Sequence, residues 1–113
     1  MHELSIVESF IQVAIDHAKK ADAERIIRIN LTVGELTGVV EEAVQFYFNF
    51  LSKDTIASSA VIDFNVKKAR LRCRDCGEMF YPGESNYRCP KCDSQHADII
   101  AGKELYVESI EVE

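Results

Sequence analysis

All four cysteines of the chain lie in one stretch of twenty residues, CRDCGEMFYPGESNYRCPKC. They form two C-x-x-C pairs, Cys73 with Cys76 and Cys89 with Cys92, separated by twelve residues. A C-x-x-C pair can turn back on itself so that both sulfurs face one point. Two such pairs offer four thiolates in a tetrahedron, which is the arrangement of closed structural zinc sites. The spacing therefore predicts a structural Zn(II) site.

Two other uses of paired cysteines are disfavoured by their context. Disulfides would require export, but the chain begins without a basic n-region, a long apolar run or a cleavage-site pattern. A redox C-x-x-C motif opens a helix after a strand and would not occur twice. The sequence thus predicts a cytoplasmic protein with no membrane segment.

Chain length limits the number of domains, and the distribution of charge distinguishes the cysteine region from the rest of the chain. The 113 residues suffice for one modest domain, or for a small domain with a metal-held module. The formal net charge is −6, yet residues 67–92 carry seven Lys and Arg against three Asp and Glu. The cysteine region is therefore a basic segment in an acidic chain.

The first residues, MHELS, carry a second candidate metal site. The terminal amine of Met1, the imidazole of His2 and the amide between them can close fused chelate rings around Ni(II) or Cu(II). The amide nitrogen or carboxylate of Glu3, or an imidazole from elsewhere, can fill a fourth position. The alternative is that His2 is a solvated terminal residue.

Apolar periodicity predicts two helices, at residues 4–20 and 40–52. In the second helix, Phe46 and Phe50 extend beyond the apolar stripe, so they are either additional core contacts or a docking surface. Alternation predicts strands at 27–33, 61–67 and 105–112, with Ile27, Ile29, Leu31 and Val33 of the first strand and Ile62, Phe64 and Val66 of the second facing inward. The third strand changes phase near Glu108–Ser109, which predicts a β-bulge.

These elements predict an α+β fold in which two helices pack on a small three-stranded mixed sheet. The first two strands are joined through a helix, as in a parallel crossover. The cysteine module lies between the second and third strands as an inserted zinc ribbon. We expect a discontinuous domain of residues 1–69 and 102–113, and a ribbon domain of residues 70–101.

The chain resembles one family from end to end: the hydrogenase nickel-insertion accessory proteins HypA, also called HybF. The resemblance rests on Met1-His2-Glu3, the loop VGEL at residues 33–36, the pairs CRDC and CPKC, and the closing strand ELYVESIEV. A four-cysteine ribbon by itself occurs in many families, but its combination with MHE at the terminus is specific.

The resemblance implies a nickel metallochaperone. Members of this family bind Ni(II) through His2, with the terminal amine and backbone nitrogens of the Met1–Glu3 segment also implicated, and hold structural zinc through the four cysteines. They work with the GTPase HypB and deliver nickel to the precursor of the [NiFe]-hydrogenase large subunit; in some bacteria they also support urease maturation. His96 is a candidate fourth nickel ligand, and an exposed loop histidine is the equally weighted alternative.

Two other functional classes compete with this interpretation. A nucleic-acid-binding or adaptor zinc ribbon would use the basic and aromatic residues Arg70, Arg72, Arg74, Phe80, Tyr81, Tyr87, Arg88 and Lys91, but the acidic chain lacks the basic excess that phosphate binding normally shows. Arginines at alternate positions also suit the solvated face of a strand entering the ribbon. An enzyme is not expected, because four thiolates leave zinc no open position for water. The sequence leaves open whether two chains form a homodimer.

Overall fold

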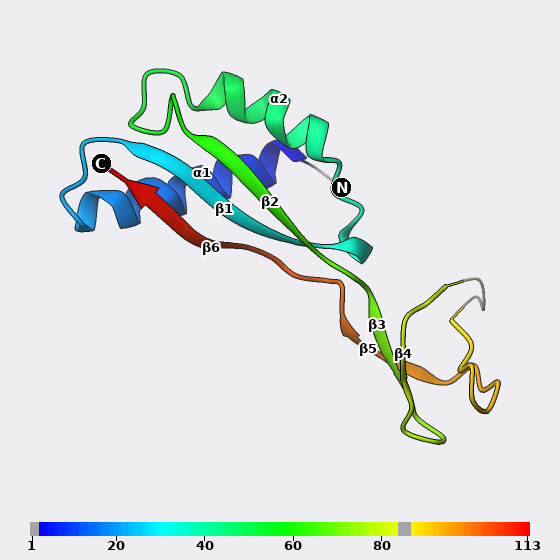
Figure 1. Ribbon diagram of the computed structural model, residues 1–113. Helices are drawn as coiled ribbons and strands as arrows, with labels where there is room; N and C mark the ends of the chain where they lie inside the picture. Colours follow the sequence, from blue (N-terminus) through cyan, green and yellow to red (C-terminus); the bar gives the residue numbers. More distant parts are fainter. Residues whose placement is uncertain (1–2, 84–86) are drawn as a thin grey trace.

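The computed structural model describes residues 3–83 and 87–113 (Figure 1). The larger unit contains α1 (Glu3–Lys20), β1 (Ile26–Gly34), the 3-10 helix η1 (Glu35–Thr37), α2 (Glu41–Leu51), β2 (Val61–Lys67) and β6 (Leu105–Val112). Its sheet has the order β2-β1-β6, with β1 parallel to β2 and antiparallel to β6. The predicted α+β fold with two helices and a mixed three-stranded sheet is confirmed.

One hydrophobic core joins both helices to the same face of this sheet. Within this core, the rings of Phe10 in α1 and Phe48 in α2 stack with centroids 6.0 Å apart. Phe46 and Phe50 of α2 lie outside it, with 69% and 67% of their surfaces exposed. The buried apolar side chains of this core come from α1, β1, α2, β2 and the connection between α2 and β2, and β6 adds partly buried residues: Val7, Phe10, Ile11, Ala14, Ala18, Ile26, Ile29, Leu31, Val33, Val44, Phe48, Ala57 and Ile62 are buried, and Leu105, Val107 and Ile110 are partly buried.

The β1–β6 pairing explains one confirmed prediction and one wrong one. Between the pairs Asn30↔Ser109 and Leu31↔Val107, Glu108 is an extra residue in β6, which confirms the predicted bulge. A second register shift lies between Ile26 and Arg28. Ile26 is consequently buried whereas Ile27 is 44% exposed, so the prediction that Ile27 faces inward is wrong.

The end of β2 differs from the sequence prediction in the same way. Ile62 is buried, but Val66, at an alternate position of the same strand, is 51% exposed. Figure 1 shows β2 continuing past both helices toward the second unit, so this end of the strand has no helical layer above it. The alternation of apolar residues predicted which face of β2 Val66 lies on, but it could not predict that the helices covering this face end before Val66.

The second unit is a small antiparallel sheet of β3 (Arg70–Cys73), β4 (Met79–Phe80) and β5 (Ala97–Ala101), in the order β4-β3-β5. Residues 68–69 lead into it and residues 102–104 lead out, which gives an elongated molecule of 55 × 25 × 17 Å (Figure 1). The division into residues 1–69 with 102–113 and residues 70–101 stays a prediction. None of the described helices is both long and apolar enough to cross a membrane.

Candidate metal centre

The four cysteine thiols converge in the second unit. The Sγ atoms of Cys73, Cys76, Cys89 and Cys92 all lie within 4.8 Å of one another. The Sγ atoms of Cys73 and Cys92 are 3.5 Å apart, as are those of Cys76 and Cys89. A regular tetrahedron with Zn–S bonds of about 2.3 Å has edges of about 3.8 Å, whereas a disulfide requires about 2.05 Å. The donor set therefore fits a closed four-thiolate zinc site and not two disulfides.

Each C-x-x-C pair forms the same type of turn, which is closed by a backbone hydrogen bond. The N–H of Gly77 donates to the carbonyl of Cys73 at 3.0 Å, and the N–H of Asp93 donates to the carbonyl of Cys89 at 2.8 Å. Both donors have positive φ, 77° at Gly77 and 61° at Asp93. Glycine tolerates this conformation, and aspartate is one of the few other residues that adopt it readily. These two turns bring both sulfurs of each pair to one side.

The hydrophobic core under the cluster is small. Leu71, Cys73, Phe80 and Cys89 are its buried members, and Ala97 packs against them. Two of the four buried residues are thus candidate metal ligands. Cys76 and Cys92 are exposed. The ribbon accordingly depends on its metal for much of its cohesion.

Without a metal ion, the thiols of Cys73 and Cys92 have very different pKa values. The backbone N–H of Cys76 lowers the pKa of the Cys73 thiol to about 6. The pKa of Cys92 rises to about 12: the backbone N–H of Ser94 favours its thiolate, but the hydrogen bond with the Cys73 thiol and partial desolvation by neighbouring atoms outweigh that effect. Four adjacent thiols cannot all ionise without a cation, so Zn(II) would displace protons as it binds.

Polar side chains connect the two halves of the ribbon around the cluster. Ser94 Oγ donates a hydrogen bond to the Asp75 carboxylate, so residues next to different C-x-x-C pairs are joined. Nδ1 of His96 lies 3.6 Å from Asp75 Oδ2. Arg74 Nη2 forms an ion pair with Asp98 Oδ1 at 2.7 Å. Sequence reasoning missed these partners, since nothing in the spacing of Asp75 and Ser94 indicates that they meet.

The predicted nickel residues are only partly described. Met1 and His2 lie outside the described residues. Glu3 begins α1, and its Oε2 accepts a hydrogen bond from the N–H of Val40 at 3.4 Å. His96 immediately precedes β5 in the ribbon and its side chain is 76% exposed. Among residues 3–83 and 87–113, the four cysteines form the one group of three or more potential ligands.

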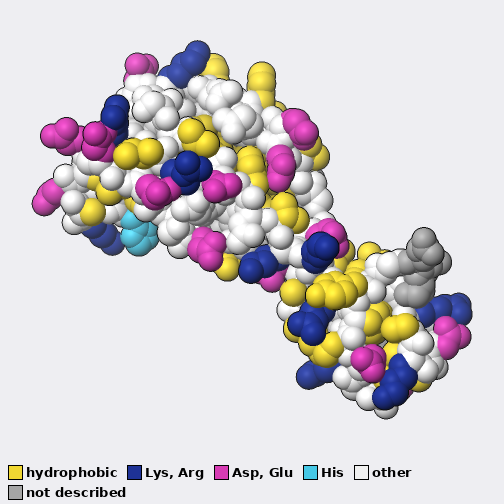
Figure 2. All heavy atoms as spheres, viewed as in Figure 1, with side chains coloured by type: hydrophobic (Ala, Val, Ile, Leu, Met, Phe, Trp, Pro, Cys, Tyr) yellow, Lys and Arg dark blue, Asp and Glu magenta, His cyan; other side chains and the backbone are white. Residues whose placement is uncertain are grey.

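Several basic residues of the ribbon are paired with carboxylates. Arg88 lies 3.6 Å from Asp93, and Lys91 lies 3.9 Å from Glu78, in addition to the Arg74–Asp98 pair. Arg70 and Arg72 occupy the exposed face of β3, as their alternation predicted. Figure 2 shows acidic and basic side chains interspersed over the visible surface. This distribution disfavours a phosphate-binding face.

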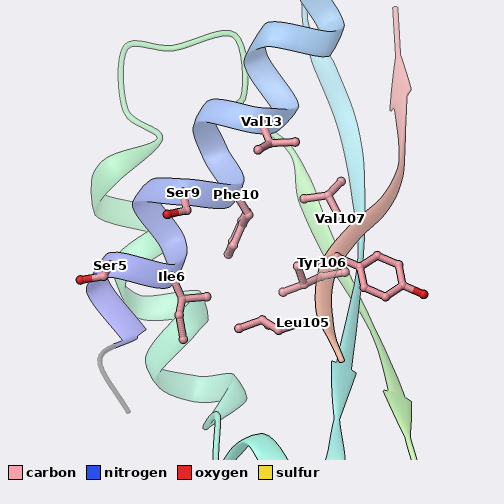
Figure 3. Close-up of a pocket in the computed structure, with 9 residues that line it drawn as sticks. Ser5, Ile6, Ser9, Phe10, Val13, Leu105, Tyr106 and Val107 are labelled. Atoms are coloured by element: carbon pink, nitrogen blue, oxygen red, sulfur yellow. The ribbon is translucent and has the colours of Figure 1, made fainter. Parts of the chain in front are cut away.

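A groove of about 470 Å³ lies between α1 and β6, away from the cysteines. Ile6, Phe10, Leu105 and Val107 point toward one another across it, whereas Tyr106 points to the opposite side of the sheet (Figure 3). Ser5 and Ser9 line its helical side. The groove is mainly apolar, and among the described residues neither Glu3, His96 nor any of the four cysteines lines it.

Residues 1–112 match a family model described as "Hydrogenase/urease nickel incorporation, metallochaperone, hypA". The chain belongs to the HypA family. It is 46% identical over 113 residues to a hydrogenase maturation factor HypA of Dehalococcoides mccartyi, covering all of this chain and 95% of that protein. A HypA of Caldanaerobacter subterraneus subsp. tengcongensis is 37% identical over 114 residues, and each chain is fully covered.

Solved HypA structures share the fold. The solution structure of the nickel metallochaperone HypA from Helicobacter pylori superposes with a TM-score of 0.72 at 31% identity, covering 99% of this chain and 97% of that one. A second HypA solution structure gives a TM-score of 0.76 at 32% identity, covering 99% and 96%. The chain is thus a member of a nickel metallochaperone family and not an enzyme. Its four-cysteine cluster is suited to structural zinc.

Proposed function

We propose that this chain binds Ni(II) at its N-terminus and delivers it in the cytoplasm, with the GTPase HypB, to the precursor of the [NiFe]-hydrogenase large subunit. The observation that carries this proposal is the match of residues 1–112 to a family of hydrogenase and urease nickel incorporation. That family description names two recipients, so urease and its accessory proteins are the second destination to test.

The two metals are assigned to sites of opposite character. The four thiolates would surround Zn(II) completely, which suits a resident structural metal and offers no vacant position for exchange. A transported ion instead needs ligands that a recipient can replace one at a time. The amine of Met1, the imidazole of His2 and the neighbouring amide nitrogens form such a chelate, and nitrogen donors suit Ni(II).

Glu3 and His96 are the proposed additional nickel ligands. Glu3 directly follows the chelating residues, and its Oε2 accepts a hydrogen bond from the N–H of Val40. In His96, the Asp75 carboxylate lies beside Nδ1. A carboxylate at one ring nitrogen orients a histidine that ligates through the other. If His96 binds nickel, His96→Ala will lower Ni(II) affinity and change the coordination spectrum; an unchanged affinity and spectrum would remove His96 from the site.

The deciding experiment is a Ni(II) titration of the zinc-loaded protein, with zinc measured before and after. We expect about one Ni(II) per chain, lost in His2→Ala while the zinc content stays constant. His17→Ala is the matched control, because His17 is an exposed histidine in the last turn of α1 and far from the terminus in sequence. Equal nickel binding by wild type and His2→Ala would refute the N-terminal site. Binding of DNA or RNA with a steep salt dependence would instead support an adaptor or nucleic-acid role.

Delivery is tested separately from binding. We expect the nickel-loaded chain to transfer its metal to the hydrogenase large-subunit precursor faster with HypB and GTP than without them. Transfer that is equally fast without HypB would refute the proposed partnership. The same assay with apo-urease and its accessory proteins decides between the two recipients.

A further inference from the structure

The segment Gly34–Val40, here called the junction loop, lies where the ribbon joins the larger unit. The N–H of Leu36 donates to the carbonyl of Gly102 at 2.7 Å, on the linker that leaves the ribbon. Glu35 Oε1 accepts a hydrogen bond from the N–H of Ala69 at 3.1 Å, on the linker that enters it. Two adjacent residues of the loop therefore hold both linkers.

The packing at this point is close. Ala69 and Gly102 are buried. Gly102 has φ of 117°, and a Cβ atom there would lie 2.8 Å from Ala69 Cα and 3.2 Å from Leu36 Cδ1. The two linkers and the loop are thus in direct backbone contact, which leaves little space for the ribbon to turn without breaking these contacts.

The other end of the junction loop reaches the first turn of α1. Val40 N–H donates to Glu3 Oε2 at 3.4 Å. Within the loop, Thr37 Oγ1 donates to the carbonyl of Gly34 at 2.8 Å and accepts from the N–H of Val39 at 3.2 Å. The backbone of the junction loop, with hydrogen bonds at both of its ends, therefore connects the first turn of α1 to the ribbon linkers.

We propose that the junction loop holds the ribbon in one orientation and couples that orientation to the N-terminal turn, with Glu35 as the positioning residue. Glu35 carries this role because its carboxylate is the side-chain acceptor for the linker entering the ribbon, whereas Gly34 and Leu36 bond to the linker leaving it through backbone atoms. The coupling to the terminus rests on the proposed function, since it presumes that nickel binds beside Glu3. The orientation does not depend on that function.

Two substitutions distinguish the effect of the hydrogen-bond acceptor of Glu35 from the effect of its negative charge. Glu35→Ala removes the acceptor and leaves the N–H of Ala69 without it. Glu35→Gln retains an oxygen that can accept the same bond. Glu35 is exposed, so neither change opens the core. Lys68→Ala is the matched control, because it truncates an exposed side chain of the same linker that forms no ion pair among the described residues.

The orientation is tested by residual dipolar couplings of the full-length, zinc-loaded, nickel-free protein. We expect the couplings of both units to fit one alignment tensor in wild type, Glu35→Gln and Lys68→Ala. We expect Glu35→Ala to require two tensors, with a smaller magnitude for the ribbon. A single tensor in Glu35→Ala, or two tensors in wild type, would overturn the proposal.

The coupling is tested by Ni(II) titration of the same four proteins. Glu35→Ala should bind Ni(II) about 3- to 10-fold more weakly than wild type, and Glu35→Gln should match wild type. Glu35→Ala with two tensors but wild-type nickel affinity would overturn the coupling. A wild-type chain that binds no nickel would overturn the proposed function and the coupling together, while the alignment tensors would still decide the orientation.

Discussion

The backbones of Gly34 and Gly102 are so close that a Cβ atom at Gly34 would lie 2.2 Å from the carbonyl carbon of Gly102. The N–H of Gly34 also donates to the carbonyl of Glu104 at 2.6 Å, so the end of β1 is pressed against the linker that leaves the ribbon. At position 34 there is space for the hydrogen atom of glycine but not for the Cβ atom of any other residue. The glycine of the VGEL loop is therefore required by the junction between the two units.

The first prediction follows from that contact. Gly34→Ala should destabilise the protein by about 1–3 kcal/mol, because the added methyl meets backbone atoms that cannot move aside. Gly83→Ala is the control, since no atom of the described residues would lie within 4 Å of a Cβ there, and it should stay within about 0.5 kcal/mol of wild type. Urea unfolding of the zinc-loaded variants measures both. Equal stability of the two variants would contradict the close approach.

Removal of zinc should unfold the ribbon and leave the larger unit folded. The buried core of the ribbon consists of Leu71, Phe80 and two of the cysteines, whereas the helices and the mixed sheet have their own larger core. Chelation should therefore collapse the amide NMR signals of residues 70–101 and preserve those of α1 and β1. Cys92→Ser should reproduce this pattern with zinc present. Dispersed ribbon signals after complete chelation would show that the metal is not structural.

Two phenylalanines of α2 should differ sharply in their contribution to stability. Phe48 is buried against Phe10, so Phe48→Ala should cost about 3–5 kcal/mol. Phe46 is largely exposed, and Phe46→Ala should change the free energy of unfolding by less than about 0.5 kcal/mol. Denaturant unfolding of both variants tests the core assignment. A large cost at Phe46 would mean that a further contact covers it in solution.

Glu104 gives a pH-dependent prediction at the junction. Its own backbone N–H and that of Gly102 donate to its carboxylate, with Gly102 at 2.7 Å, and they lower its pKa below the usual 4.5. A lowered folded-state pKa means that the ionised group stabilises the fold above pH 4.5 and that this contribution is lost as the pH falls through the folded pKa. Glu104→Gln should therefore be less stable than wild type near pH 7.

Comparison at low pH provides the control for Glu104. The difference between Glu104→Gln and wild type should shrink below pH 4.5, where the native carboxylate also becomes protonated. Zinc loss in acid affects both proteins and so does not produce this difference. A stability gap that is constant from pH 7 to pH 3.5, measured by thermal unfolding, would show that the charge of Glu104 contributes nothing.

The sequence by itself determined most features that rest on local periodicity or spacing, with Ile27 and Val66 as the exceptions. The apolar repeat of α1, the alternation in β1 and the phase change at Glu108 depend on which side of the backbone successive residues face, and this is a property of neighbours in the chain. The C-x-x-C spacing likewise predicted a shared metal site, because each turn converges two thiols locally.

Tertiary structure alone decided where layers end and which distant groups meet. Ile26 replaces Ile27 in the core because of a shift in pairing with β6, and Val66 is exposed because β2 extends beyond the helices. The bonds of Glu35 to Ala69 and of Ser94 to Asp75 join residues 34 and 19 positions apart. No local pattern encodes such contacts, because they form only after the strands have brought their linkers together.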